Sequence, residues 1–289
     1  MSRDLLNQIQ TMFPTLSKGQ KYIARYIIEH YDKAAFMTAS KLGNIVGVSE
    51  STVVRFASEL GYEGYPQLQK ALQEMIRNKL TSVQRIEVST DVLGDGDILE
   101  KVLNSDIEKI RKTLADVSRD DFNHAVDSIV NARKVYIFGV RSSASLASFI
   151  GFYFNLILDN VTLIHTASDS ELFEQILRVG EADAVIGVSF PRYSTRTVKA
   201  MQYASSRGAT VISITDSHLS PLYRYSNYNL LAKSDMASFV DSLVAPLSLI
   251  NALIVAVGMK RQDEVYHTFD ELERIWDEYG VYEKPGAEK

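Results

Sequence analysis

The chain has 289 residues, of which 46% are hydrophobic and 23% charged, so it is long enough for two globular domains with separate cores. It contains no cysteine, which excludes disulfide bonds, thiolate metal sites and a cysteine nucleophile. The net charge of −5 excludes a uniformly basic nucleic-acid binder, but residues 1–80 carry ten basic and seven acidic side chains, which leaves residues 81–289 at −8. A slightly basic first part indicates where a polyanion would bind.

Residues 1–80 are predicted to form a small helical domain. Ser17 followed by Gln20 has the spacing of a capping box and begins an amphipathic helix. Further helices are predicted over 39–46, 50–60 and 66–78. No long apolar run of the kind found in a secretory signal precedes them, and together with the absence of cysteine this predicts a cytoplasmic protein.

Within this domain, the two middle helices have the pattern of a helix-turn-helix. Gly43 provides the small contact that two steeply crossing helices need, and Gly47, four residues later, provides a left-handed turn. Ser49 is placed to cap the second helix. An ordinary helical hairpin is the alternative, but the two glycines favour the DNA-binding motif, as do the apolar positions in register with them: Leu42, Val46, Val48, Val53 and Phe56.

Polar side chains that can enter a major groove gather at the start of the second helix. Arg55, one turn further on, can reach a guanine edge or a phosphate. Tyr62 and Tyr65 either contact the DNA backbone or wedge the next helix, and we favour the wedge. Lys18, Lys21 and Arg25 could also touch phosphates, although solvated surface groups are the more common role. The candidate DNA-binding residues are Lys41, Ser49, Glu50, Ser51, Thr52 and Arg55.

The composition changes after residue 80. Residues 81–97 are polar, contain two glycines and show no sustained period, which predicts a linker. Asp97 can cap a connecting helix with Ile98, Leu99, Val102, Leu103, Ile107, Ile110 and Leu114 on one side. We therefore expect a helix-turn-helix domain (1–80), a linker with a connecting helix (81–119), a second domain (120–262) and a C-terminal helix and tail (263–289).

From about residue 120 onward, short apolar runs alternate with amphipathic segments. Buried strands that alternate with helices predict an α/β three-layer sandwich with a parallel five-stranded sheet. Ligands bind at the carboxyl ends of such strands, so we expect the site in the loops after Gly139, Ser189 and Thr215. The predicted strands are 134–139, 160–165, 183–189, 209–215 and 227–232, and the predicted helices between them are 142–158, 169–178 and 195–207.

Two further helices are predicted over 238–259 and 263–279. The first coincides with the longest apolar stretch of the chain. Asp241 and Pro246 interrupt this stretch, which favours a helix buried against the sheet over a membrane span.

Three stretches together resemble the RpiR family of bacterial transcriptional regulators. They are GVSESTVVRFASELGYEGYPQLQKAL at 47–72, FGVRSSASLA at 138–147 and SFPRYSTRTVKAMQYASSRGATVISITDS at 189–217. The resemblance runs from about residue 5 to 260. It implies a sugar isomerase (SIS) fold for the second domain, which binds phosphosugars and usually associates as dimers. The implied partners are double-stranded DNA with an inverted repeat, a small anionic sugar-derived effector and a second copy, in a homodimer or homotetramer.

In that fold, two hydroxyl-rich loops hold the phosphate. The first typically reads Gly-x-Gly-Ser-Ser. Here Ser142 and Ser143 match it, whereas Arg141 replaces the second glycine. The second loop typically reads Ser-x-Ser-Gly-x-Thr. Here Ser189 and Ser194 match its ends, whereas Pro191 and Arg192 replace the inner serine and the glycine.

Each loop leads from a strand into a helix N-terminus, where free amides and the helix dipole favour an anion. The alternative is that the serines are only helix caps. The two arginines could grip an anion with paired hydrogen bonds, fill the pocket or reach a partner subunit. The candidate effector-binding residues are Arg141, Ser142, Ser143, Ser189, Arg192 and Ser194.

These features together predict a DNA-binding transcriptional regulator, more often a repressor in this family, that is controlled by an anionic sugar. A phosphosugar isomerase is the main alternative, with Glu171, His165 and His218 as candidate bases. A helical domain that binds another protein is a third. No catalytic residue, metal site or cofactor is expected, because no ligand spacing or nucleotide-binding loop is present.

Overall fold

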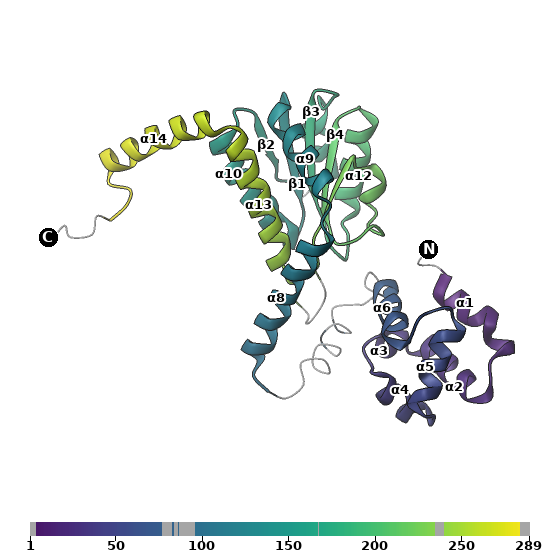
Figure 1. The fold of residues 1–289 in the computed structure, drawn as a ribbon. Coiled ribbons are helices and arrows are strands. Elements are labelled where there is room, and N and C mark those ends of the chain that lie inside the picture. Colours follow the sequence, from purple (N-terminus) through teal and green to yellow (C-terminus); the bar gives the residue numbers. More distant parts are fainter. Residues whose placement is uncertain are drawn as a thin grey trace. The chain divides into compact units, whose positions relative to one another are not determined.

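The computed structural model describes residues 4–76, 96–166, 168–234 and 240–283, together with Val83 and Ile86. The chain divides into two compact units (Figure 1), which we describe separately. The first comprises Met1–Leu103 and Met236–Asp241, and the second comprises Asn104–Asp235 and Ser242–Lys289. We call residues 4–76 the head and the second unit the body. Most of the predicted linker, 81–97, lies outside the described residues.

The head is a bundle of short helices around its own core. Ser17 and Gln20 form the predicted capping box: the Ser17 side chain accepts from the Gln20 amide, and the Gln20 side chain accepts from the Ser17 amide. Ile23, Leu42 and Phe56 are completely buried at the centre of the bundle. The elements are α1 (Asp4–Met12), η1 (Phe13–Thr15), α2 (Lys18–Glu29), α3 (Tyr31–Ala34), α4 (Ala39–Val46), α5 (Glu50–Glu59) and α6 (Tyr65–Ile76).

Tyr65 wedges α6 against the rest of the head. Its ring is buried, and its hydroxyl donates to the Met37 carbonyl oxygen at 2.8 Å. Burial raises the pKa of Tyr65 to about 12. Gln69 donates a second hydrogen bond to the same carbonyl. The wedge predicted for Tyr65 is confirmed, although α6 begins one residue before the predicted 66 and its continuation beyond Ile76 lies outside the described residues.

The body is a three-layer α/β sandwich, as predicted (Figure 1). Five parallel strands lie in the order β2-β1-β3-β4-β5. Apolar side chains of α9, α10 and α13 pack on one face of the sheet, and those of α11 and α12 pack on the other. The strands are β1 (Lys134–Gly139), β2 (Val161–Ile164), β3 (Asp183–Val188), β4 (Thr210–Thr215) and β5 (Tyr228–Leu231). The remaining elements are α8 (Ile98–Asp116), α9 (Arg119–Asn131), α10 (Ser142–Ile157), α11 (Asp169–Ile176), α12 (Thr195–Ser206), η2 (Tyr223–Tyr225), α13 (Val244–Lys260) and α14 (Gln262–Tyr279).

Two helices differ from their predictions. Helix α13 begins at Val244 rather than at 238, with Pro246 in its first turn, where a proline costs no backbone hydrogen bond. On α8, the predicted apolar side is exposed at Ile107 and Leu114, whereas Lys109 and Thr113 are buried. Within the described residues, no single helix is both long and apolar enough to cross a membrane, and a bent pair, α13 with α14, meets that test only in combination.

Polar contacts hold α8 to the segment that follows β5. The Lys233 amide donates to Thr113 Oγ1 at 2.8 Å, and Ser242 Oγ donates to Asp106 at 2.6 Å. The buried Lys109 ammonium group donates to the same carboxylate at 3.2 Å. These partners explain why the polar side of α8, and not its apolar side, faces the body.

Candidate functional site

The turn between α4 and α5 depends on two glycines, as predicted. A Cβ on Gly43 would lie 2.7 Å from the Val48 carbonyl oxygen, so no larger residue fits without a backbone shift. Gly47 ends α4 with a φ of 73°, a left-handed conformation that glycine adopts without steric cost. The two helices therefore approach closely, which is the geometry of a helix-turn-helix.

The start of α5 presents a cluster of hydroxyl groups. Ser49 holds the N-cap position as predicted, but its side chain does not cap the helix. Its Oγ instead lies 2.9 Å from Ser51 Oγ and 2.9 Å from Thr52 Oγ1. The cap predicted from Ser49 is therefore only partly correct, because neighbouring hydroxyls compete with the backbone amides for its oxygen.

Most of the other predicted DNA-binding side chains lie on the exposed side of this motif. Glu50, Ser51 and Arg55 are exposed, and the Arg55 Nε donates to the Ser51 carbonyl oxygen at 3.3 Å. Lys41 is also exposed, in the first turn of α4. Val54 is 38% exposed and was not predicted, although its spacing of three residues from Ser51 places it on the same side. An apolar side chain there can contact a thymine methyl group.

In the body, the two predicted effector loops start side by side. Gly139, the last residue of β1, is paired with Val188, the last residue of β3. After β1 the chain continues to β2, and after β3 it continues to β4. These two strands flank the β1–β3 pair, so the chain leaves the pair in opposite directions across the sheet. Such a switch of direction forms a crevice at the carboxyl ends of the strands, where α/β proteins bind ligands.

The first effector loop turns sharply into α10. A Cβ on Gly139 would lie 2.5 Å from the Ser143 carbonyl oxygen, so only glycine allows this close return. Arg141 adopts a φ of 59°, which is unusual for a residue with a side chain, at the position where the family has glycine. It occupies the N-cap of α10 without a side-chain cap. Ser142 is exposed and Ser143 is buried in the first turn.

The second effector loop is fixed by its own serines. The buried Ser189 Oγ accepts from the Ser194 amide at 3.2 Å, and Ser194 Oγ caps α12 by accepting from the Thr197 amide at 3.5 Å. The capping role considered for these serines therefore applies to Ser194. Arg192, between them, is exposed.

The end of β4 and the loop after it add two residues, Thr215 and Asp216, that were not among the predicted effector-binding side chains. Asp216 is 2% exposed and accepts a hydrogen bond of 2.6 Å from the Tyr193 hydroxyl. Thr215 Oγ1 donates to the Ser189 carbonyl oxygen at 2.8 Å. These bonds join the loops that follow β3 and β4. The position of Asp216 directly after a predicted strand was the available signal.

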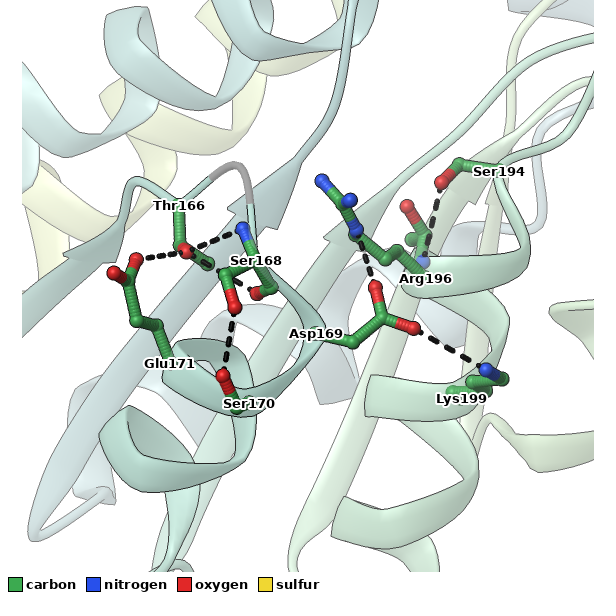
Figure 2. A network of polar contacts seen from close by, with 9 residues as sticks. Thr166, Ser168, Asp169, Ser170, Glu171, Ser194, Arg196 and Lys199 are labelled. Atoms are coloured by element: carbon green, nitrogen blue, oxygen red, sulfur yellow. Dashed lines mark hydrogen bonds and ion pairs between the residues drawn. The ribbon is translucent and has the colours of Figure 1, made fainter.

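A polar network lies near the start of α12 (Figure 2). Asp169 of α11 accepts from Arg196 Nε at 2.5 Å and from Lys199 Nζ at 3.3 Å. These two cations hold the pKa of the Asp169 carboxyl below its usual value. Because Arg196 is engaged in this way, the arginines placed to meet an anion from the effector loops are Arg141 and Arg192.

The three side chains considered as bases for isomerase chemistry each have a different environment. Glu171 accepts a hydrogen bond from Thr166 Oγ1 (Figure 2), and the His218 ring packs edge-on against Tyr223. His165 is exposed directly after β2. Across the described ranges, no group of three histidine or carboxylate side chains could hold a metal ion.

Two family models match the chain. The helix-turn-helix domain of the rpiR family covers residues 3–79, and the SIS domain covers residues 128–256. An uncharacterized HTH-type transcriptional regulator of Caldanaerobacter subterraneus is 24% identical over 277 residues, covering 94% of this chain and 96% of that protein. The transcriptional regulator HexR of Pseudomonas aeruginosa is 25% identical over 267 residues, covering 90% of each chain.

Solved structures show the same fold. The sugar isomerase domain of an RpiR transcription factor from Sphaerobacter thermophilus is 27% identical with a TM-score of 0.59, covering 62% of this chain and 99% of that one. The Vibrio vulnificus NanR protein, complexed with ManNAc-6P, is 21% identical with a TM-score of 0.57, covering 94% of this chain and 99% of that one.

Proposed function

Because the chain belongs to the RpiR family of helix-turn-helix transcriptional regulators and carries a SIS domain, we propose that it represses genes of carbohydrate metabolism under the control of a phosphorylated or otherwise anionic sugar. The observation that carries this proposal is the pair of effector loops. They start side by side at a switch point of a parallel sheet, and each opens into a helix N-terminus beside an exposed arginine.

In this proposal, the head binds double-stranded DNA through the start of α5. Ser49, Ser51 and Thr52 face the groove with Glu50, Arg55 reads a guanine edge or holds a phosphate, and Lys41 contacts the backbone. Two copies in a homodimer, or four in a homotetramer, would place recognition helices on an inverted repeat. A cytoplasmic location follows from this role.

The effector is proposed to bind between the two loops. Arg141 and Arg192 supply charge, while Ser142, Ser143, Ser189 and Ser194 supply hydroxyls and a fixed loop shape. A phosphosugar fits this set of donors, and the NanR structure, which holds ManNAc-6P, supports that class of ligand. We assign the chain no enzymatic activity, in keeping with the names of its relatives.

Control of DNA binding requires the effector to favour one arrangement of the heads over another, since equal binding to both would change nothing. Helix α8 is suited to carry this preference. Thr113 and Asp106 tie it to the segment after β5, which leaves the sheet at the same edge as the effector loops. The helix leads back along the chain toward the linker.

The experiment that tests the proposal is selection of genomic DNA fragments by the purified protein, repeated with a panel of hexose and pentose phosphates. We expect one inverted repeat to be enriched and one compound to change that enrichment. A variant with Arg55→Ala and Ser51→Ala serves as the control for specific reading. No enrichment under any condition would reject the regulator, and isomer formation from the same phosphosugars would support the alternative enzyme.

A further inference from the structure

Helix α14 carries an apolar stripe that the described residues leave partly or fully exposed. Figure 1 shows the helix leaving the body at the end of α13, from which it bends by 98°. None of its side chains is buried. Its apolar residues are nevertheless spaced by four, three, four and three positions, which places them on one side of a helix. The α14 stripe consists of Val265, Phe269, Leu272, Trp276 and Tyr279.

A second apolar surface lies on the outer side of α10 and α13. Helix α10 contains no charged residue, and α13 contains only Lys260, at its end. Their inner sides pack into the core of the body. An outer side without charges is unusual for a surface helix and marks an interaction site. The α10–α13 face consists of the exposed residues Phe152, Val244, Leu247, Val255 and Met259.

We propose that two copies of the chain associate by placing the α14 stripe of each on the α10–α13 face of the other. This inference deepens the homodimer of the proposed function and rests on it. Each chain provides both an α14 stripe and an α10–α13 face. A two-fold arrangement therefore forms two identical contacts between stripe and face, which leaves neither surface open and closes the assembly. Helix α14 contacts α10 and α13, so the stripe begins beside the α10–α13 face of its own chain.

The aromatic residues of the two surfaces supply a substantial part of the area that a stable dimer needs. Phe152 of the face and Tyr279 of the stripe are 64% and 75% exposed, and an aromatic side chain buries roughly 150–250 Å². These two alone supply on the order of 200–350 Å², and the other residues of both surfaces add to it. A standard interface needs about 800 Å² from each partner.

The charges on α14 favour a protein partner over a membrane. Its polar side has seven acidic residues and a single arginine. An interfacial membrane helix carries lysine and arginine on that side, because lipid surfaces are anionic. An acidic outer side suits an arm that lies on a neutral protein face and points its charges to water.

The first test locates the contact by cross-linking in the full-length protein. Since the chain has no cysteine, an introduced one is a specific handle. Tagged copies carry Ile275→Cys, next to Trp276 of the α14 stripe, and untagged copies carry Val255→Cys, on the α10–α13 face. The two are co-expressed and treated with a short bis-maleimide. We expect a product that contains both kinds of chain, and at least fivefold less of it when His267→Cys replaces Ile275→Cys. An equal or absent product overturns the proposal.

The second test measures self-association by sedimentation velocity. Leu272→Glu should raise the dissociation constant of the dimer at least tenfold, whereas His267→Glu, the same substitution on the acidic side of α14, should leave it unchanged. If Leu272→Glu leaves the dissociation constant of the dimer unchanged, the α14 stripe is not the interface, although the proposed function stands. If the wild-type protein is a monomer at micromolar concentration, the dimer itself is rejected. Binding to phosphatidylglycerol vesicles that Leu272→Glu abolishes would replace the partner with a membrane. DNA selection and effector binding are measured in separate experiments, so a failure of the proposed function can be told apart from a failure of this interface.

Discussion

The head and the body both place serines and an arginine at the start of a helix, but they expose them differently. In the head, the hydroxyls of Ser49 and Ser51 lie at the surface and bond to each other. In the body, Ser143 in the first turn of α10 and Ser189 directly after β3 are buried. An exposed row can follow a long polymer, whereas buried hydroxyls in loops that carry an exposed arginine suit a small anion. We therefore expect the exposure of a helix start, more than its residue types, to separate the two proposed kinds of partner.

The largest expected effects come from the glycine that shapes each site. Gly43→Ala should destabilise the head and weaken DNA binding at least ~100-fold, equivalent to about 2.7 kcal/mol, while effector binding persists. Gly139→Ala should abolish effector binding, while DNA binding by the head persists. In both cases the added Cβ meets a backbone oxygen, at 2.7 and 2.5 Å, and overpacking of this kind costs roughly 1–3 kcal/mol.

Thermal unfolding and the two binding assays check these glycine variants. Gly64→Ala in the head and Gly180→Ala in the body are matched controls, because a Cβ there meets only an ordinary contact or open space. Loss of both binding activities in either variant would contradict the separation of head and body.

Arg55→Ala tests how the exposed row reads DNA. If Arg55 contacts a guanine edge, the variant should lose about 1–3 kcal/mol for the operator and much less for random DNA. If it holds a phosphate, both should weaken equally, with a shallower dependence on salt. Lys33→Ala, which removes an exposed cation from α3, is the control. Affinities measured at several salt concentrations decide between the two, and an unchanged affinity removes Arg55 from the interface.

Arg192→Ala tests the rim of the effector site. We expect effector binding to weaken at least tenfold, or ~1.4 kcal/mol, because a charge-assisted bond to the anion is lost. Isothermal titration calorimetry with the compound identified by DNA selection measures this. Arg207→Ala, an exposed arginine at the other end of α12, should have no effect. An affinity equal to that of the wild type would exclude Arg192 from the site.

The smallest effect is expected from Asp169→Asn, which removes the ion pairs between α11 and α12. Because Arg196 and Lys199 lower the pKa of Asp169, its carboxylate stabilises the body above the ordinary pKa of 3.8, and this stabilisation is lost as the pH falls through the lowered value. The melting temperature of the variant should lie slightly below that of the wild type at pH 7. The difference should narrow below a pH of about 4, and a constant difference would point to another cause.

Local patterns in the sequence predicted much of the fold. Gly43 and Gly47 serve their expected roles because a close crossing and a left-handed turn are backbone requirements that single residues reveal. The five strands lie within one residue of their predicted bounds, because buried parallel strands read as continuous apolar runs.

Contacts between distant segments were beyond sequence reasoning. The pair of Tyr193 and Asp216 joins two loops that are 23 residues apart, and no local pattern marks it. The buried Lys109 of α8 is an exception to the rule that the apolar side of a helix faces inward. Its ammonium group donates to Ser105 and Asp106 of the same helix. The Asp106 carboxylate also accepts from Ser242, which is far along the chain, and no local pattern predicts this contact. Ser49 failed as a side-chain cap for a similar reason, since its neighbours offered better partners.

The core of the head consists entirely of residues between Leu5 and Met75. All of these are synthesised before the first strand of the body leaves the ribosome, so the head can fold while the rest of the chain is still being made. A nonsense mutation within the body would therefore leave a folded head without a complete SIS domain. Under the proposed function, such a fragment would keep its DNA-binding helices and lose its response to the effector.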